Sequence, residues 1–338
     1  MSKTYDITAV GAALVDTEIH VSDEDLRQLG IAKGMMTLVD EAKQAQYLSY
    51  LREHIDSAHR ACGGSAANTL IASSYMGCRN FMTCRVADDE YGDIFLGDLE
   101  KAGIDYNHNS QRVAGETGKC LVMLTPDAER SMNTCLGVSA ELDANSLHPE
   151  VIADSRWVYI EGYLSTSPAN LEAATRTQEL ARESGTQIAL SLSDPGIAAH
   201  FRTQLRSIAG GQIDMLFCNR DEALAWTETE NLDDALQALQ RASRSYAVTL
   251  GAAGAIVFAA GKRDQVASPK VRAVDTNGAG DSFAGAYLAA LIQGASAVEA
   301  AEFACRCAAQ LVESVGPRLQ GVEYRQLAAN SGWSKTTV

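Results

Sequence analysis

The sequence predicts an α/β protein with a mainly parallel central sheet and helices on both of its faces. Short apolar runs that are typical of buried strands alternate with longer stretches of helical periodicity, for example Trp157–Gly162, Pro168–Glu183 and Gln187–Leu192. The hydrophobic content, 46% of 338 residues, is enough for one large core or two modest ones. Because no repeat and no linker rich in Pro, Gly or Ser interrupts the chain, we expect one domain over residues 1–338 rather than two equal ones.

Net charge and cysteine content narrow the classes of partner. The formal net charge is −15 and the pI is near 4.8, which disfavours nucleic acid and anionic membrane surfaces because like charges repel. The eight cysteines include no Cys-x-x-Cys pair, which favours reduced thiols over disulfides or a zinc site. The chain has no N-terminal signal and no apolar run of about 18 residues. We therefore expect a cytoplasmic protein.

The first predicted strand carries an acidic residue close to its end. Apolar residues over Ile7–Leu14 predict a buried strand, and Asp16 follows where the strand should leave the sheet. Ligands bind at that edge of an open α/β sheet, although an Asp after a strand is also a common turn former. A helix is predicted from Glu41 to Ser57.

Two glycine turns lead directly into helical patterns. The first is Cys62-Gly-Gly-Ser-Ala-Ala-Asn68, in which Ser65 could act as the helix N-cap. The second is Asp275-Thr-Asn-Gly-Ala-Gly-Asp281, followed by apolar residues at the spacing of one buried helical face. Glycine lets the backbone curl tightly there, and the unpaired N–H groups of a helix start favour an anion.

The carboxylate of Asp281 has two interpretations. Asp is a favoured helix cap and stabilises a helix by about 1 kcal/mol in that position. Alternatively, a carboxylate beside an anion-binding turn could take a proton from a hydroxyl that attacks a phosphoryl group. The backbone amides of Gly278, Ala279 and Gly280 would form the anion hole.

Further polar residues follow predicted strands later in the chain. Arg130 begins the second strand of a predicted pair, where an arginine is usually solvent-exposed. Asn219 and Glu222 follow the strand Met215–Cys218 at the spacing of a helix N-cap and its N3 partner. The remaining predicted elements are a strand at Phe81–Val86, a helix at Ala198–Ala209 and a hairpin-like turn from Thr249 through Gly251 to Gly254.

Taken together, these motifs resemble the ribokinase-like (PfkB-type) carbohydrate and nucleoside kinases. The stretch Asp275–Asp281 matches the family pattern Asp-Thr-x-Gly-Ala-Gly-Asp, and Gly63–Asn68 matches Gly-Gly-x-x-x-Asn. The resemblance runs from about Ile7 to about Pro317. It implies a three-layer α/β/α fold with a mainly parallel central sheet and a small β lid. The lid would be discontinuous and formed from about 17–39 and 106–136.

The resemblance also implies roles for individual residues. In the family, the acceptor's hydroxyls are bound by the residues that match Asp16 and Asn68, and Gly63–Gly64 let it approach the backbone. Asp281 would be the catalytic base, and Arg130 would reach the transferring phosphate. Glu222 with Asn219 would organise hydrated Mg²⁺. The residues that would contact the nucleotide are Thr249, Gly251, Gly254 and Asn277.

Among the branches of this family, the adenosine kinases resemble the chain best, through Asn277, the Gly-Gly-Ser before Asn68, and Arg130-Ser. The apolar Met36 and the aromatic Tyr163 could form a slot for a purine. We therefore expect transfer of the γ-phosphoryl of ATP to a nucleoside, with adenosine favoured and with Mg²⁺ required; whether K⁺ activates is open, as is the choice between monomer and homodimer.

Alternatives remain within and outside this class. A sugar kinase of the same family, acting on fructose, ribose or 2-keto-3-deoxygluconate, would share most of these positions. A non-catalytic nucleoside- or sugar-binding regulator is a second alternative, against which the presence of Asp281 argues. A dinucleotide dehydrogenase is disfavoured because no Gly-x-Gly-x-x-Gly follows the first strand, and no Walker-type phosphate loop occurs.

Overall fold

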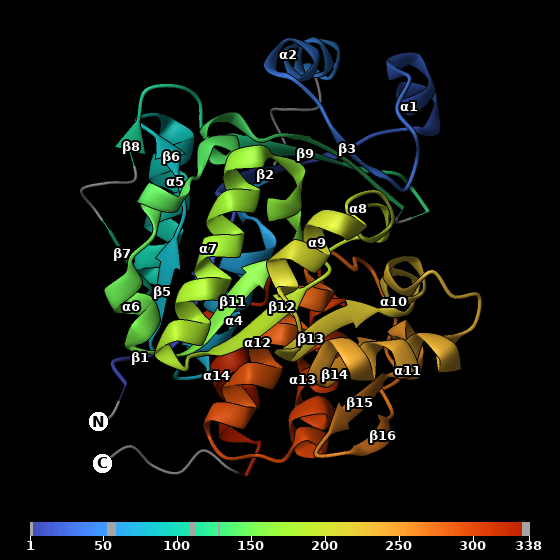
Figure 1. Cartoon of the computed structure of the whole chain (residues 1–338). Helices are drawn as coiled ribbons and strands as arrows, with labels where there is room; N and C mark the ends of the chain where they lie inside the picture. Colours follow the sequence, from blue (N-terminus) through green and yellow to red (C-terminus); the bar gives the residue numbers. More distant parts are fainter. Residues whose placement is uncertain (1–2, 53–58, 108–111, 128, 333–338) are drawn as a thin grey trace.

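The central sheet organises the chain, as seen in the computed structural model, which describes residues 3–52, 59–107, 112–127 and 129–332 (Figure 1). Within these residues nine strands form one sheet, in the order β16-β15-β14-β13-β12-β11-β1-β5-β7. The strands are, in chain order, β1 (Tyr5–Val10), β5 (Asn80–Thr83), β7 (Asp105–Tyr106), β11 (Ser155–Glu161), β12 (Gln187–Ser191), β13 (Ile213–Asn219), β14 (Ser243–Thr249), β15 (Ala255–Ala259) and β16 (Lys262–Val266).

Strand direction confirms a mainly parallel sheet. Neighbours from β7 to β14 pair in parallel, and β1 lies between β11 and β5 with Ile7 opposite both Trp157 and Asn80. Among the described strands of this nine-stranded sheet, only the edge formed by β14, β15 and β16 is antiparallel. It includes the hairpin that the sequence predicts after Thr249.

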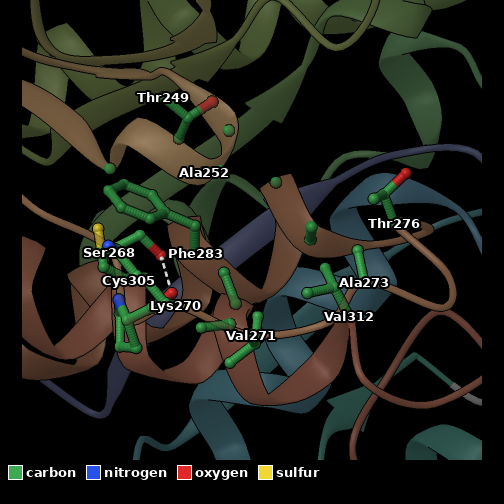
Figure 2. A pocket seen from close by; sticks show the side chains of 17 residues that line it. Thr249, Ala252, Ser268, Lys270, Val271, Ala273, Thr276, Phe283, Cys305 and Val312 are labelled. Carbon is green, nitrogen blue, oxygen red and sulfur yellow. Dashed lines mark hydrogen bonds between the residues drawn. The ribbon is translucent and has the colours of Figure 1, made fainter.

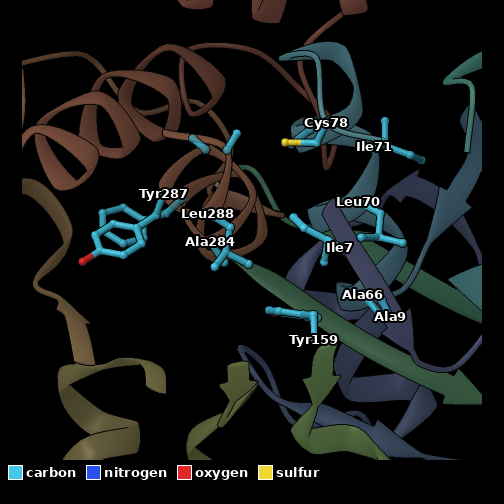
Figure 3. Close-up of a cluster of buried hydrophobic side chains, with 14 of the residues drawn as sticks. Ile7, Ala9, Ala66, Leu70, Ile71, Cys78, Tyr159, Ala284, Tyr287 and Leu288 are labelled. Carbon is cyan, nitrogen blue, oxygen red and sulfur yellow. The ribbon is translucent and has the colours of Figure 1, made fainter. Parts of the chain in front are cut away.

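Alternate residues of the central strands pack into two cores on opposite faces of the sheet. Ile7, Ala9 and Tyr159 belong to the first core (Figure 3), whereas Val10 and Val158 belong to the second. The first core is covered by α4 (Ser65–Tyr75), α5 (Glu90–Lys101), α12 (Ala279–Ile292), α13 (Ala297–Leu311) and α14 (Gly321–Ala329). The second is covered by α6 (Pro149–Ala153), α7 (Pro168–Ser184), α8 (Pro195–His200), α9 (Arg202–Ala209), α10 (Arg220–Thr227) and α11 (Leu232–Ala242). The protein therefore has the three-layer α/β/α architecture that the sequence predicts.

A smaller sheet lies at one end of the molecule, together with the first two helices (Figure 1). Its strand order is β3-β10-β9-β2-β4, and it packs on a separate small core that contains Ile19, Leu26, Tyr47 and Leu121. The elements are β2 (Leu14–His20), α1 (Asp23–Leu29), β3 (Met36–Leu38), α2 (Glu41–Tyr50), β4 (His59–Gly63), β9 (Gly118–Leu124) and β10 (Arg130–Cys135).

Short elements complete the chain. A two-stranded sheet pairs β6 (Val86–Ala87) with β8 (Arg112–Val113), and the 3₁₀ turns are η1 (Gly137–Glu141), η2 (Ala144–Ser146), η3 (Gly162–Thr166) and η4 (Gly251–Ala253). None of the helices in the described part of the chain is long and apolar enough to cross a membrane.

Several predicted boundaries are wrong. Asp16 lies inside β2 of the small sheet rather than in a turn after β1, because the chain passes directly from one sheet to the other. The helix predicted over 198–209 is two helices, since Asp194 caps α8 earlier and the backbone at Phe201 leaves the helical region. The strand predicted over 81–86 is divided between β5 and β6. The helix predicted from Glu41 is described as α2 to Tyr50, and residues 53–58 lie outside the described part.

Candidate active site

The first turn of α12 forms one wall of the candidate site. Gly278 is its N-cap and has φ 67°, a left-handed conformation that favours glycine. A Cβ at this position would collide with the carbonyl oxygen of Pro317, because the loop between α13 and α14 packs directly against this turn. The amides of Ala279, Gly280 and Asp281 lie in the first turn, where no intrahelical partner is available. The Ala279 amide makes a long bond of 3.3 Å to the Thr276 carbonyl.

Asp281 is the third residue of α12 and is held by the start of α4. The Ser65 hydroxyl donates to its Oδ1 at 2.6 Å, and the Asn68 amide Nδ2 donates to its Oδ2 at 3.1 Å. Asp281 is therefore not the helix cap. The structure brings together the carboxylate and the asparagine that the sequence predicts for one site, although 213 positions separate them along the chain.

Burial raises the pKa of Asp281, whereas the hydrogen bonds from Ser65 and Asn68 and the positive charge of Arg318 lower it. The net direction is upward from the ordinary value for an aspartate. A carboxylate with a raised pKa is a better proton acceptor when it is ionised, which suits a general base.

The turn before α4 brings its backbone close to Asp16. Gly64, not Ser65, is the N-cap of α4 and has φ 85°, so the predicted capping role of Ser65 is wrong; its hydroxyl is instead bonded to Asp281. A Cβ at Gly63 would collide with the Asp16 carboxylate. Asp16 is 8% exposed, and burial raises its pKa to about 7, partly offset by the charge of Arg318.

Another buried carboxylate, that of Glu161, lies beside the same turn. The sequence patterns do not single out this residue. It ends β11 and accepts the N–H groups of Ala12 and Ala66, each at 2.7 Å. Burial raises its pKa to about 7. Because it joins the end of β1 to the start of α4, it fixes the turn that carries Gly63 and Gly64. An acidic residue at the end of an apolar strand is its only sequence signal.

Arg130 contacts the loop that precedes α12. Its Nη1 lies 2.7 Å from Asp275 Oδ1, and its Nη2 donates to the Thr276 hydroxyl at 2.6 Å. Asp275 also accepts the N–H groups of Asn277 at 2.9 Å and Gly316 at 2.8 Å. The Arg130 side chain, at the start of β10, is therefore only 13% exposed and contacts this loop instead of extending into solvent, and its contact with a transferring phosphate stays a prediction.

An apolar cavity of about 330 Å³ adjoins the start of α12 (Figure 2). Thr249, Gly251 and Gly254 line it from the β14–β15 turn, and Gly280 lines it from α12. The remaining lining residues that give it its apolar character are Ala252, Val271, Ala273, Phe283, Cys305, Ala308, Ala309 and Val312. Three of the four residues expected to contact a nucleotide thus share one cavity, whereas Asn277 contributes its backbone N–H to Asp275.

Asn219 and Glu222 form a capping box at the start of α10. The Glu222 N–H donates to Asn219 Oδ1 at 2.8 Å, and the Glu222 carboxylate accepts from the Asn219 N–H at 3.0 Å and from its Nδ2 at 2.6 Å. Burial, together with the charges of Asp194 and Asp281, raises the pKa of Glu222 to about 8 against the lowering effect of the hydrogen bond from the Asn219 N–H. Among the described residues, no group of three His, Cys, Asp or Glu side chains could hold a metal ion. One carboxylate acting through water suits Mg²⁺, which retains several of its waters.

Met36 and Tyr163 come from different parts of the fold. Met36 lies on β3 of the small sheet, and Tyr163 lies in η3 after β11. Both are half-buried and pack against the second core of the main sheet. The small sheet therefore reaches the main body at the end of the central strands where Asp16 and Glu161 also lie.

The fold and this arrangement define the class of the protein. It is an α/β enzyme in which a carboxylate of raised pKa lies beside a helix N-terminus and a cavity. Comparison with known proteins identifies the family. The profile of the pfkB family carbohydrate kinases matches residues 33–323. The chain belongs to this family and is a kinase.

Individual relatives agree with the family and differ in their acceptors. The crystal structure of adenosine kinase from Sinorhizobium meliloti is 33% identical, with a TM-score of 0.90, over 97% of this chain and 99% of that one. Adenosine kinase of Saccharomyces cerevisiae is 26% identical over 93% of this chain and 96% of its own length. Probable fructokinase-3 of Arabidopsis thaliana is 31% identical over 71% of this chain and 72% of its own.

Proposed function

We propose that this kinase transfers the γ-phosphoryl of ATP to the hydroxymethyl group of a nucleoside, with adenosine the favoured acceptor. The observation that supports it best is the pair of hydrogen bonds from Ser65 and Asn68 to Asp281, beside the cavity at the start of α12. In this proposal Asp281 is the base, the start of α4 binds the acceptor, and the first turn of α12 binds the transferring phosphoryl group.

The acceptor would be bound by the elements around Asp16. The carboxylate of Asp16 and the amide of Asn68 suit two neighbouring hydroxyls of a ribose, because together they offer acceptor and donor groups. Gly63 and Gly64 allow the backbone to pass close to the Asp16 carboxylate and the Ala12 carbonyl, which brings the start of α4 next to Asp16. The hydroxymethyl group would then face Asp281, which takes its proton as the hydroxyl attacks phosphorus.

The nucleotide would occupy the apolar cavity with its phosphates toward α12. Thr249, Gly251 and Gly254 would border the base and ribose, and the amides of Gly278, Ala279 and Gly280 would hold the transferring phosphoryl. Arg130 and Asn277 keep the preceding loop in place through Asp275. Mg²⁺, ordered through water by Glu222 with Asn219, would neutralise charge on the phosphates.

The metal assignment has its own test. Changing Glu222 to Gln keeps the shape but removes the carboxyl group that can ionise when the hydrated metal binds, so the Mg²⁺ concentration for half-maximal rate should rise while acceptor KM stays nearly constant. An unaltered magnesium titration would leave Glu222 with the capping role alone.

The parts of the small sheet that come from the ranges 17–39 and 106–136 would act as a lid over the acceptor, whereas β4 of the same sheet lies outside both ranges. Closure excludes water, which competes with the acceptor for the phosphoryl group. Met36 would then lie against the base of the nucleoside together with Tyr163, and stacking on such side chains contributes about 1–3 kcal/mol.

A sugar kinase is the second candidate, because the plant fructokinase is as similar in identity as the adenosine kinases. A free hexose has additional hydroxyls, and an unpaired buried hydroxyl costs about 1–3 kcal/mol. Apolar side chains on β3, Met36 and Leu38, favour a purine over such a sugar. A non-catalytic regulator is disfavoured by the intact Asp281.

The deciding experiment is an assay of ADP formation with adenosine, inosine, ribose, fructose and 2-keto-3-deoxygluconate under identical Mg²⁺ and K⁺. We expect the highest kcat/KM with adenosine. A higher value with a free sugar than with either nucleoside would overturn the acceptor and leave the kinase chemistry unchanged. Activity with none of them, in protein shown to bind ATP, would favour the regulator.

A further inference from the structure

We infer that Arg318 is a positioning residue for phosphoryl transfer, which orients the Asn68 amide and, through it, the Asp281 carboxylate. This inference rests on the proposed role of Asp281 as the base. No motif in the sequence contains Arg318, which lies where the family resemblance ends, at about Pro317. Its role emerges only from the contacts that it makes.

The guanidinium of Arg318 bridges three elements. Nη1 donates to Asn68 Oδ1 at 2.8 Å and also to the carbonyl oxygen of Cys62, and Nη2 lies 3.3 Å from Asp98 Oδ2. Asp98 Oδ2 in turn accepts the N–H of Cys62 at 3.1 Å. The side chain of Arg318 is 13% exposed and that of Asp98 is 20% exposed. The arginine is thus held between β4, α4 and α5.

These contacts determine which way the Asn68 amide faces. A carboxamide has one oxygen that accepts and one nitrogen that donates. Because Oδ1 accepts from Arg318, Nδ2 is directed to Asp281, where it donates at 3.1 Å. The flipped amide would place Nδ2 against the guanidinium and Oδ1 against the carboxylate, and both contacts would be repulsive. Arg318 therefore excludes the flipped orientation.

The loop that carries Arg318 also supports the anion-binding turn. The Pro317 carbonyl packs against Gly278, and the Gly316 N–H donates to Asp275 Oδ2 at 2.8 Å. One short segment, 316–318, therefore contacts both the turn before α12 and the residue that orients the base. A shift of this segment would disturb the two sides of the proposed reaction centre together.

Charge reinforces the geometry. The negative charge of Asp281 contributes to the raised pKa of three further carboxyl groups, namely Asp16, Glu161 and Glu222. Arg318 is a cation that lowers the pKa of both Asp281 and Asp16 against the effect of burial. Loss of this charge should raise the pKa of Asp281 and keep the base protonated to higher pH.

The chain offers a matched control in Lys101. Its Nζ pairs with the other oxygen of the same aspartate, Asp98 Oδ1, at 3.0 Å, but its side chain is 75% exposed. Both Arg318→Met and Lys101→Met remove one positive partner of Asp98. Only the first removes the contact with Asn68.

The test compares Arg318→Met, Arg318→Lys and Lys101→Met with the wild type over pH, using the best acceptor from the screen. For Arg318→Met we expect kcat to fall by on the order of 10- to 100-fold, nucleotide KM to change less than about twofold, and the acid limb of kcat to move to higher pH. Arg318→Lys should restore the position of the acid limb, because charge is retained. It should recover kcat only in part, because one ammonium cannot reproduce the forked contacts. Lys101→Met should match the wild type.

Two outcomes would overturn the inference. One is a folded Arg318→Met protein with the kcat and acid limb of Lys101→Met. The other is an Arg318→Lys protein with the full wild-type kcat. This second outcome decides the question if thermal unfolding measurements show that Arg318→Met is not folded. Failure of the proposed function is distinguishable, since the wild type itself would then lack activity or Asp281→Asn would retain it.

Discussion

The guanidinium of Arg130 and the carboxylate of Asp275 form an ion pair of 2.7 Å that joins the small sheet to the loop before α12. The side chains are 13% and 1% exposed, so the pair is largely shielded from water. Arg130 also donates to Thr276, which lies in the same loop. These two contacts therefore link the small sheet directly to the loop that leads into the anion-binding turn.

Removing Arg130 should destabilise the protein because it leaves a buried carboxylate without its cation. We expect Arg130→Met to lower the free energy of unfolding by about 3–5 kcal/mol, measured by urea denaturation. In a double-mutant cycle with Asp275→Asn, the double variant should be less destabilised than the sum of the single variants. Additive effects would contradict a direct interaction.

An exposed ion pair supplies the control for this prediction. Arg112 lies 2.7 Å from Asp93, but the side chains are 37% and 68% exposed. Arg112→Met should therefore change the free energy of unfolding by less than about 1 kcal/mol.

Replacement of Asp281 should abolish the proposed base while leaving the shape of the site. We expect Asp281→Asn to lower kcat by about 10²–10⁴-fold, with nucleotide affinity unchanged in a binding titration. Asp234 is the third residue of α11, as Asp281 is of α12, and it lies on the surface. Asp234→Asn should retain full turnover; equal turnover in Asp281→Asn would rule out the base assignment.

The raised pKa of Glu222 predicts how stability depends on pH. Its carboxyl ionises near pH 4.3 in an unfolded chain but at about 8 in the folded protein. Between these values the folded state holds a proton that the unfolded state has lost, so stability from this group falls as pH rises. Glu222→Gln carries no such charge. Its unfolding free energy relative to wild type should therefore increase from pH 5 to pH 8.

Glu299 is a matched control for this measurement. It occupies the same third position in a capping box, at the start of α13, but it is exposed and hydrogen bonds from Ser296 lower its pKa. Its stabilising contribution is complete above its unfolded pKa, so the effect of Glu299→Gln should be constant from pH 5 to pH 8. If the effect of Glu222→Gln on the unfolding free energy were also constant from pH 5 to pH 8, that result would contradict the raised pKa of Glu222.

The proposed lid predicts a ligand-dependent change in hydrogen exchange. Amides in 17–39 should exchange more slowly when the acceptor binds, because closure buries Met36 and its neighbours. ATP alone should have little effect there, and α7, which does not line the cavity proposed for the nucleotide, should be unchanged in every state. Exchange in 17–39 that is indifferent to the acceptor would exclude a moving lid.

Local patterns were sufficient to predict much of the fold and part of the site. The alternation of apolar strands and helices predicts the parallel sheet, and glycine turns predict the starts of α4 and α12. The capping box of Asn219 and Glu222 is likewise a pattern within four residues, and the structure confirms it.

Other features depend on contacts between distant parts of the chain. Strand β4 carries too few alternating apolar residues to be predicted, and it forms because β2 supplies a partner, with Asp16 opposite Ala61. Arg318 and Asn68 are 250 positions apart, so no local signal links them. Glu161 is an isolated acid in an apolar strand, and its two amide donors become visible only when α4 packs against β1.

The packing of 316–318 against Gly278 and Asn68 has a consequence for biosynthesis. A chain that has been translated only as far as α13 already contains the two glycine motifs and the whole central sheet. It still lacks the carbonyl that supports Gly278 and the guanidinium that orients Asn68. Ribosome-bound or prematurely terminated chains that end before residue 316 should therefore adopt most of the fold without a competent reaction centre, so that activity appears only after residues 316–318 have been synthesised.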